Sequence, residues 1–178
     1  SDPLETDEVT IEKIAQANIE LADTLKIKEF GLYGFHTGAI ISIAMGHHYP
    51  DRVKAIACNG VLVLTDSELE NIRRQYLPPY KPQWDGSHLS WLWSRMREQL
   101  VFFPWHERKE EARMRFDISS PEILHENSIE IMRAGDKYRQ AYGAAFEYRL
   151  EDFVPELSVP ALITAGESDP LSKCLEKL

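Results

Sequence analysis

The chain has 178 residues, of which 43% are hydrophobic and 28% are charged. This length and balance predict one globular domain with an inserted subdomain, and they argue against a disordered chain. No stretch approaches the ~20 consecutive apolar residues that span a bilayer, and from the polar residues 1–5 we expect no secretory signal in this sequence. Two cysteines are too few for a disulfide framework, so we expect reduced thiols and a cytoplasmic location.

The formal net charge is −9, and the excess acid lies at the two ends of the chain. Residues 1–35 carry eight acidic and three basic side chains, and residues 151–178 carry six and two. The basic residues between them alternate with acidic ones and form no basic patch. Such a surface repels phosphate, so we expect a small-molecule substrate or ligand as the partner and neither a nucleic acid nor a membrane.

Hydrophobic periodicity predicts a strand–helix–strand unit in the first third of the chain. Apolar residues at three- and four-residue spacing indicate an amphipathic helix over residues 9–25. A short strand is predicted over 28–34, a helix over 37–48 that Pro50 closes, and a second strand over 53–58. This order predicts two parallel strands joined by a right-handed crossover.

The composition changes after residue 65. Residues 67–150 are rich in arginine, glutamate and aromatic side chains, with helical periodicity and all four tryptophans within residues 84–105. We therefore predict an inserted set of short helices. A third strand is predicted over 159–166 with a turn at 167–170, and the last eight residues could begin a helix. The predicted layout is a core at 1–66, an insertion at 67–150 and a returning core segment at 151–178.

The pentapeptide at residues 34–38, Gly-Phe-His-Thr-Gly, lies between the first strand and the second helix. A sharp strand-to-helix turn forces its central residue into a strained conformation and favours small residues two positions to either side. It presents one side chain above the sheet, beside a helix N-terminus that attracts negative charge. The pattern is that of the nucleophile elbow G-x-S-x-G, with His36 in the position of the serine.

Two longer segments resemble the α/β-hydrolase superfamily. Residues 34–53 (GFHTGAIISIAMGHHYPDRV) resemble its elbow helix and the following turn, and residues 159–171 (VPALITAGESDPL) resemble its late strand with the acid-bearing loop. The resemblance implies an α/β fold whose parallel-sheet core carries an inserted helical cap. It also implies Asp169 as the catalytic acid, with Glu167 and Asp152 as alternatives, and the Thr37 N–H as an oxyanion donor.

The sequence also departs from that family. The family has further strands before the elbow, and its catalytic histidine follows the acid, whereas all six histidines here precede Asp169. We therefore expect a central segment of the fold, truncated on both sides and inactive alone. Its core would be incomplete, and an open sheet edge could favour self-association.

Histidine at the elbow leaves three functions open. His36 can attack an acyl carbon or activate a water in a hydrolase, pair with an aspartate in another cofactor-free reaction, or lie in a noncatalytic homologue that binds a small ligand between cap and core. The first predicts hydrolysis of a small apolar carbonyl compound such as an ester or lactone. Thr37 could also supply a hydroxyl nucleophile, but its position at the start of the helix favours a capping or packing role for its side chain. Substrate-binding side chains are expected at Phe35, His88, Phe103 and Trp105.

Other candidate residues favour structural roles. Adjacent His47 and His48 point about 100° apart on a helix and suit its C-terminal end better than a metal. Cys58 ends a strand, and nothing beside it in the sequence would lower its pKa. The chain contains neither G-x-G-x-x-G nor a converging Cys/His set, so the sequence implies no nucleotide cofactor and no metal.

Overall fold

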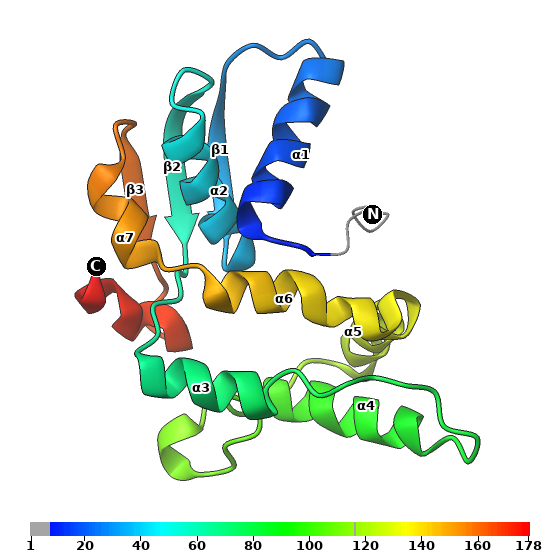
Figure 1. Ribbon diagram of the computed structural model, residues 1–178. Coiled ribbons are helices and arrows are strands. Elements are labelled where there is room, and N and C mark those ends of the chain that lie inside the picture. The colour runs from blue at the N-terminus through cyan, green and yellow to red at the C-terminus, as the bar shows by residue number, and fades with distance from the viewer. Residues whose placement is uncertain (1–7, 116) are drawn as a thin grey trace. The chain divides into compact units, whose positions relative to one another are not determined.

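The computed structural model describes residues 8–115 and 117–178, so the polar start at residues 1–5 lies outside the described residues. The chain divides into two compact units, residues 1–66 with 140–178, and residues 67–139. The elements in chain order are α1 (Ile11–Thr24), β1 (Phe30–Phe35), α2 (Thr37–His48), β2 (Val53–Asn59), α3 (Asp66–Gln75), α4 (Ser87–Gln99), α5 (Pro121–Ala134), α6 (Tyr138–Glu147), α7 (Leu150–Phe153) and β3 (Ala161–Thr164) (Figure 1). Short 3₁₀ segments lie between them, and the last, η4, spans Pro170–Lys177.

The first unit contains a parallel sheet in the order β1-β2-β3. This confirms the predicted α/β class and the parallel strand–helix–strand unit. Phe35 pairs with Asn59, and Asn59 pairs with Thr164, so the three strands finish at one edge of the sheet. Residues that follow β1, β2 and β3 therefore emerge close together, although more than 100 residues separate β2 from β3 in the chain.

Some predicted boundaries shift. β1 spans residues 30–35 rather than 28–34, and β3 spans only 161–164. Pro160 has no N–H to donate to a neighbouring strand, although its carbonyl accepts a hydrogen bond from the N–H of Ile56 (2.9 Å). The final segment, 170–177, is 3₁₀ rather than α-helical.

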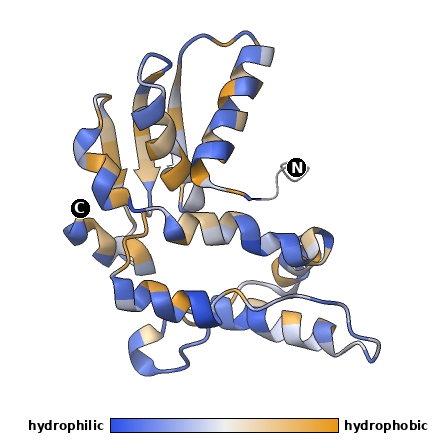
Figure 2. Ribbon diagram, viewed as in Figure 1, coloured by the Kyte–Doolittle hydropathy of each residue, from blue (hydrophilic) through white to orange (hydrophobic). Residues whose placement is uncertain are grey.

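Helices cover one face of the sheet. α2 packs against β1 and β2, while α1 and α7 pack against α2. α1 alternates between hydrophilic and hydrophobic residues, whereas β2 is mostly hydrophobic (Figure 2). Thr10 caps the start of α1, because its hydroxyl accepts a hydrogen bond from the Lys13 N–H (3.3 Å). The helix buries its apolar side, Ile11, Ala15, Ile19 and Ala22.

The opposite face of the sheet is uncovered within the described residues. Tyr33 and Phe35 on β1 are 71% and 54% exposed, and Leu162 on β3 is 63% exposed. Their strand neighbours on the covered side, such as Cys58, are buried. Parallel sheets normally have both faces covered, so this face and the outer edges of β1 and β3 leave apolar surface and backbone groups open. Self-association through such an edge stays a prediction.

The second unit is helical and has its own aromatic core. Trp105 is buried, and its indole N–H donates to the carbonyl oxygen of Tyr76 (2.9 Å). Trp84, in contrast, is fully exposed at the turn before α4. The tryptophans of residues 84–105 therefore do not act as one group. Among the described residues, no helix combines the length and apolar character that a bilayer crossing demands.

Candidate functional site

His36 occupies the turn between β1 and α2. Its backbone has φ 49° and ψ −112°, a region that costs a residue with a side chain about 1–3 kcal/mol. Three hydrogen bonds hold it there: its N–H donates to the Asn59 carbonyl (3.0 Å), and its own carbonyl accepts from the N–H groups of Ala39 and Ile40 (2.9 and 3.3 Å). The start of α2 and the end of β2 thus enforce the strain that the sequence pattern predicts.

The two glycines that flank the turn are not equivalent. A Cβ on Gly34 would lie 2.3 Å from the Gly38 carbonyl oxygen and 2.6 Å from the Ala39 Cα, so only glycine fits at this position. A Cβ on Gly38 would meet nothing within 4 Å. The expectation that both positions exclude a side chain was therefore wrong for Gly38. The reason is that a Cβ on Gly34 would point at the backbone of the first turn of α2, whereas a Cβ on Gly38 would point into open space.

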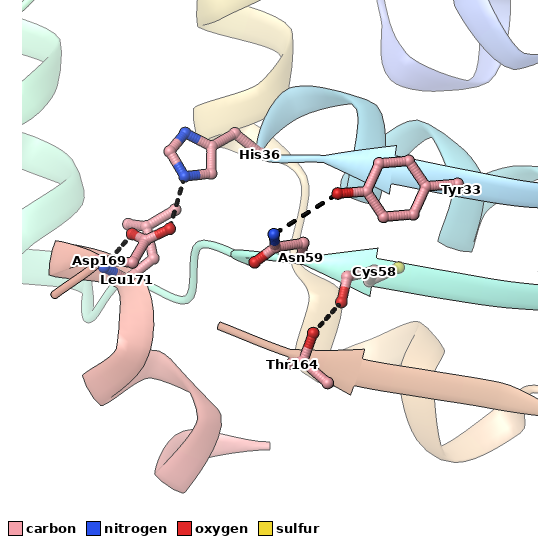
Figure 3. A network of polar contacts seen from close by, with 7 residues as sticks. All are labelled: Tyr33, His36, Cys58, Asn59, Thr164, Asp169 and Leu171. Carbon is pink, nitrogen blue, oxygen red and sulfur yellow. Dashed lines mark hydrogen bonds and ion pairs between the residues drawn. The ribbon is translucent and has the colours of Figure 1, made fainter. Parts of the chain in front are cut away.

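The imidazole of His36 meets the carboxylate of Asp169. The distance from His36 Nε2 to Asp169 Oδ2 is 2.8 Å, although 133 positions separate the residues in the chain (Figure 3). His36 follows β1, and Asp169 lies on the loop between β3 and η4. The shared edge at which the parallel strands end brings the two side chains together.

The backbone that follows Asp169 fixes its carboxylate. Its other oxygen, Oδ1, accepts a hydrogen bond from the Leu171 N–H (2.8 Å), which caps η4. Its own N–H donates to the Gly166 carbonyl (2.9 Å). The side chain of Asp169 is 11% exposed, against 41% for His36. The carboxylate is therefore the enclosed, anchored member of the pair, and the imidazole is the member that solvent reaches.

The contact assigns a role to each nitrogen of the imidazole. An ionised carboxylate only accepts hydrogen bonds, so it selects the neutral tautomer with its proton on Nε2. Nδ1 then carries the lone pair that is available for chemistry. The ring of Phe35 stacks on the imidazole with centroids 3.9 Å apart and an angle of 15° between the planes. A half-exposed Phe35 thus covers one face of the ring.

Thr37 is the first residue of α2. The first N–H groups of a helix have no acceptor within it, and Thr37 contributes one of them. The Thr37 N–H is therefore placed directly beside His36 as a hydrogen-bond donor. Of the three candidate acids, Asp169 meets His36; within the described residues, neither Glu167 nor Asp152 pairs with that imidazole.

The remaining substrate-binding candidates belong to the unit of residues 67–139. His88 Nδ1 accepts a hydrogen bond from the Gln83 N–H (3.0 Å), which ties the turn before α4 to the helix. Phe103 lies edge-on to Tyr76 with ring centroids 6.2 Å apart, and Trp105 lies in the core of the same unit. These contacts are structural, and a role of these three residues in binding substrate stays a prediction.

His47, His48 and Cys58, for which the sequence favours structural roles, all pack against neighbouring residues of the first unit. His47 and His48 end α2, and both rings lie against Phe153. The described residues contain no group of three or more histidine, cysteine or acidic side chains that could hold a metal. Cys58 Sγ lies 3.6 Å from the Ala39 carbonyl oxygen, and burial raises the pKa of this thiol to about 11, which confirms a core thiol.

Sequence reasoning overlooked one residue of the site, Gly60. The sequence predicts a strand over 53–58, and Asn59-Gly60 directly after it indicates no more than the end of that strand. Gly60 has φ +74° and lies against both His36 and Asp169. Glycine after a strand signals a turn of this kind, but no local pattern indicates which distant side chains will lie over it.

No protein-family model matches the chain, and no curated protein matches it at a significant level. Many solved structures do. A hydrolase from Pseudomonas aeruginosa aligns with 15% identity over 96% of this chain and 58% of its own, with a TM-score of 0.63. A bromoperoxidase from Bacillus anthracis aligns with 17% identity over 97% of this chain and 60% of its own (TM-score 0.64). An epoxide hydrolase from Mycobacterium thermoresistibile aligns with 18% identity over 96% of this chain and 63% of its own (TM-score 0.61).

These matches show that the chain has the α/β-hydrolase fold. It spans about three fifths of the length of the structures it resembles, in keeping with a sheet that is only part of that core. At 15–18% identity the likeness extends to the fold and leaves the activity open.

Proposed function

We propose that the protein is a hydrolase of small, largely apolar carbonyl compounds, esters or lactones, in which His36 and Asp169 act as a catalytic pair. The observation that carries the proposal is the 2.8 Å contact between His36 Nε2 and Asp169 Oδ2. A strained turn, a fixed carboxylate and a half-exposed imidazole gather where the parallel strands end, which is where open α/β sheets bind their ligands.

His36 acts as a general base. Asp169 accepts a hydrogen bond from Nε2–H, so the free Nδ1 takes a proton from a water molecule, and the water oxygen forms a bond to the carbonyl carbon. The resulting oxyanion collapses, the bond to the leaving alkoxide breaks, and Nδ1–H returns its proton to that alkoxide. The products are an acid and an alcohol, and the imidazole is regenerated.

Direct attack by the imidazole on the carbonyl carbon is the less favoured route. Nδ1 adjoins the ring carbon that bears the Cβ, so the approach of a carbonyl carbon to it is more hindered than the approach of a proton. An acyl-imidazole would also need a second base for its hydrolysis. Asp169, already shared between His36 and the Leu171 N–H, is poorly placed to act as that base.

The first turn of α2 supports stabilisation of the oxyanion. The Thr37 N–H lies next to His36 at the positive end of the helix dipole. One such donor contributes about 2.7–4 kcal/mol in enzymes where it has been removed. The proposed chemistry requires further donors for full activity, and the proposal concerns the whole protein, because the chain spans about three fifths of its structural neighbours.

Two structural neighbours support the substrate class. One is an enzyme described as degrading N-acyl homoserine lactones, with 17% identity over 96% of this chain and a TM-score of 0.57. Another is a carboxylesterase structure from the archaeon Nitrososphaera gargenis, with 16% identity over 97% of this chain and a TM-score of 0.65. Hydrolysis of a lactone and hydrolysis of a carboxylic ester both pass through a tetrahedral oxyanion, which forms when the water activated by His36 and Asp169 attacks the carbonyl carbon.

The test measures turnover of p-nitrophenyl acetate and of a short-chain lactone by the purified protein and its variants. We expect His36→Gln and Asp169→Ala to reduce the rate to background. Glu167→Ala, which removes an exposed carboxylate two positions from Asp169, should retain it. Full activity in His36→Gln, or no turnover by the wild-type protein with any carbonyl substrate tested, would contradict the proposal.

A further inference from the structure

We infer that Gly60 is the positioning residue of the site: its lack of a side chain lets the imidazole of His36 and the carboxylate of Asp169 meet. The claim that Gly60 matters for catalysis rests on the proposed function. The claim that Gly60 leaves room for the contact between His36 and Asp169 rests only on the distances around its Cα atom.

A side chain at position 60 would occupy the space of the pair. An ideal Cβ there would lie 2.5 Å from His36 Cδ2, 2.8 Å from His36 Nε2 and 3.0 Å from Asp169 Oδ2. Real Cβ atoms essentially never lie within 3.0 Å of a neighbour, so the imidazole of His36 would have to move, and the 3.0 Å distance to Asp169 Oδ2 is tighter than nine in ten real Cβ contacts. Nε2 and Oδ2 are the two atoms that form the contact. Even the methyl group of an alanine would therefore press against both atoms of this hydrogen bond.

Gly60 cannot move away from the pair at low cost. Its N–H donates to the carbonyl of Thr164, the last residue of β3 (2.7 Å), and the carbonyl of the preceding Asn59 accepts from the His36 N–H (3.0 Å). Asn59 is the last residue of β2 and pairs with Thr164 (Figure 3). The strand ends that bring His36 and Asp169 together are thus joined through residues 59 and 60.

The backbone conformation of Gly60 adds a second requirement for glycine. Its φ of +74° lies in the left-handed region, which costs other residues about 1 kcal/mol or more. A test has to separate this strain from the clash with the pair. Gly86 provides the matched control, because it also has φ +74° but a Cβ there would meet nothing within 4 Å.

The experiment compares Gly60→Ala with Gly86→Ala in two measurements. The first is the tautomer of His36, read from the ¹⁵N signals of its imidazole at mildly alkaline pH. We expect the Nε2–H form to dominate in the wild-type protein and in Gly86→Ala, and a mixture of tautomers in Gly60→Ala. The second is ester turnover, which we expect to fall at least about tenfold in Gly60→Ala and to stay near the wild-type rate in Gly86→Ala.

A double-mutant cycle covers the case in which Gly60→Ala does not fold. Replacing His36 by alanine removes the ring atoms that the new methyl group would meet, so the double variant His36→Ala/Gly60→Ala should fold, with a urea midpoint close to that of His36→Ala/Gly86→Ala. If His36→Ala does not restore folding to Gly60→Ala, the cost lies in the backbone alone and the inference is wrong.

The outcomes separate this inference from the proposed function. A changed His36 tautomer in Gly60→Ala, together with a wild-type protein that hydrolyses nothing, would support the positioning role and overturn the hydrolase proposal. An unchanged tautomer and unchanged turnover in Gly60→Ala, with activity that still depends on His36, would overturn the inference and leave the function standing.

Discussion

The carboxylate of Asp169 bonds the imidazole of His36 through Oδ2 and the start of η4 through Oδ1. The two oxygens therefore carry separable tasks, one in orienting the imidazole and one in capping the final helical segment. Substitutions that preserve one task and remove the other distinguish catalysis from stability at this position.

Asp169→Asn should separate these tasks. The amide oxygen can still accept from the Leu171 N–H, so we expect a change in unfolding free energy within about 0.5 kcal/mol. The amide NH₂, however, would face Nε2 and favour the opposite tautomer, so turnover should fall by about 100-fold or more. Asp169→Ala should lose activity and, in addition, about 1 kcal/mol of stability with the cap. Urea unfolding and ester turnover check both effects, and equal stability of the two variants would contradict the capping role.

Gly34→Ala and Gly38→Ala should differ sharply although both alter the same pentapeptide. In Gly34→Ala the new methyl group meets backbone atoms of Gly38 and Ala39 at 2.3–2.6 Å, which cannot yield as a flexible side chain does. We expect a loss of about 3 kcal/mol or more. In Gly38→Ala the methyl group meets nothing within 4 Å, and helix propensity favours alanine by up to about 1 kcal/mol. Equal destabilisation of the two variants in urea unfolding would contradict this geometry.

Cys58 should make the protein sensitive to alkali. Burial raises the pKa of its thiol from 9.0 to about 11, so the unfolded chain releases this proton at lower pH than the folded protein. The stability that Cys58 contributes is therefore present below pH 9 and is lost as the pH rises toward 11, by at most about 2 kcal/mol. We expect Cys58→Ala to lose less stability over this interval than the wild type. The measurement is the urea midpoint as a function of pH.

The difference between the wild-type and Cys58→Ala profiles also removes the contribution of buried tyrosines, which both proteins share. Burial raises the pKa of Tyr138 and Tyr148 above the usual value of 10.0 as well, so these groups begin to destabilise both proteins in the same way above about pH 10. Parallel profiles for the wild type and Cys58→Ala would show that the thiol is accessible in the folded protein. Slow alkylation of Cys58 at neutral pH would agree with burial.

Arg95 is a buried cation without a counter-ion among the described residues. Its side chain is 2% exposed, its Nε has no hydrogen-bond partner, and its guanidinium lies 5.3 and 5.7 Å from the ring centroids of Trp105 and Tyr138. Cation–π contacts return about 2 kcal/mol, and the hydrogen bond from Nη1 to Gln99 (2.7 Å) returns about 1.5–3 kcal/mol. The desolvation of a buried ion costs several kcal/mol.

These opposing contributions predict that Arg95→Met is neutral or stabilising in urea unfolding. Methionine fills a similar volume without a charge. Arg97→Met, two positions along the same helix and exposed to solvent, is the control and should change stability by less than about 0.5 kcal/mol. A loss above about 3 kcal/mol in Arg95→Met would mean that an anionic group compensates the guanidinium in solution.

Local patterns in the sequence were sufficient for the elements that form the sheet and the turn at His36. The apolar runs of β1, β2 and β3, the small residues around His36 and the helix that begins at Thr37 all leave marks within a few positions. The resemblance to a known family placed Asp169 ahead of Glu167 and Asp152, whereas local patterns alone did not separate Asp169 from Glu167, because a carboxylate two positions away has nearly the same local surroundings. They also suggested that Gly38 was as constrained as Gly34, since the pattern is symmetric and the turn is not.

The sequence by itself determined the α/β class, the parallel pairing of the first two strands and the strained position of His36, because these depend on periodicity and on backbone sterics over a few neighbouring residues. Only the tertiary structure decided that Asp169 binds His36 Nε2 and that Gly60 lies beneath both. Those contacts depend on the register of three strand ends, the third of which lies more than 100 residues after the second, and packing at atomic distances sets which side chains meet there.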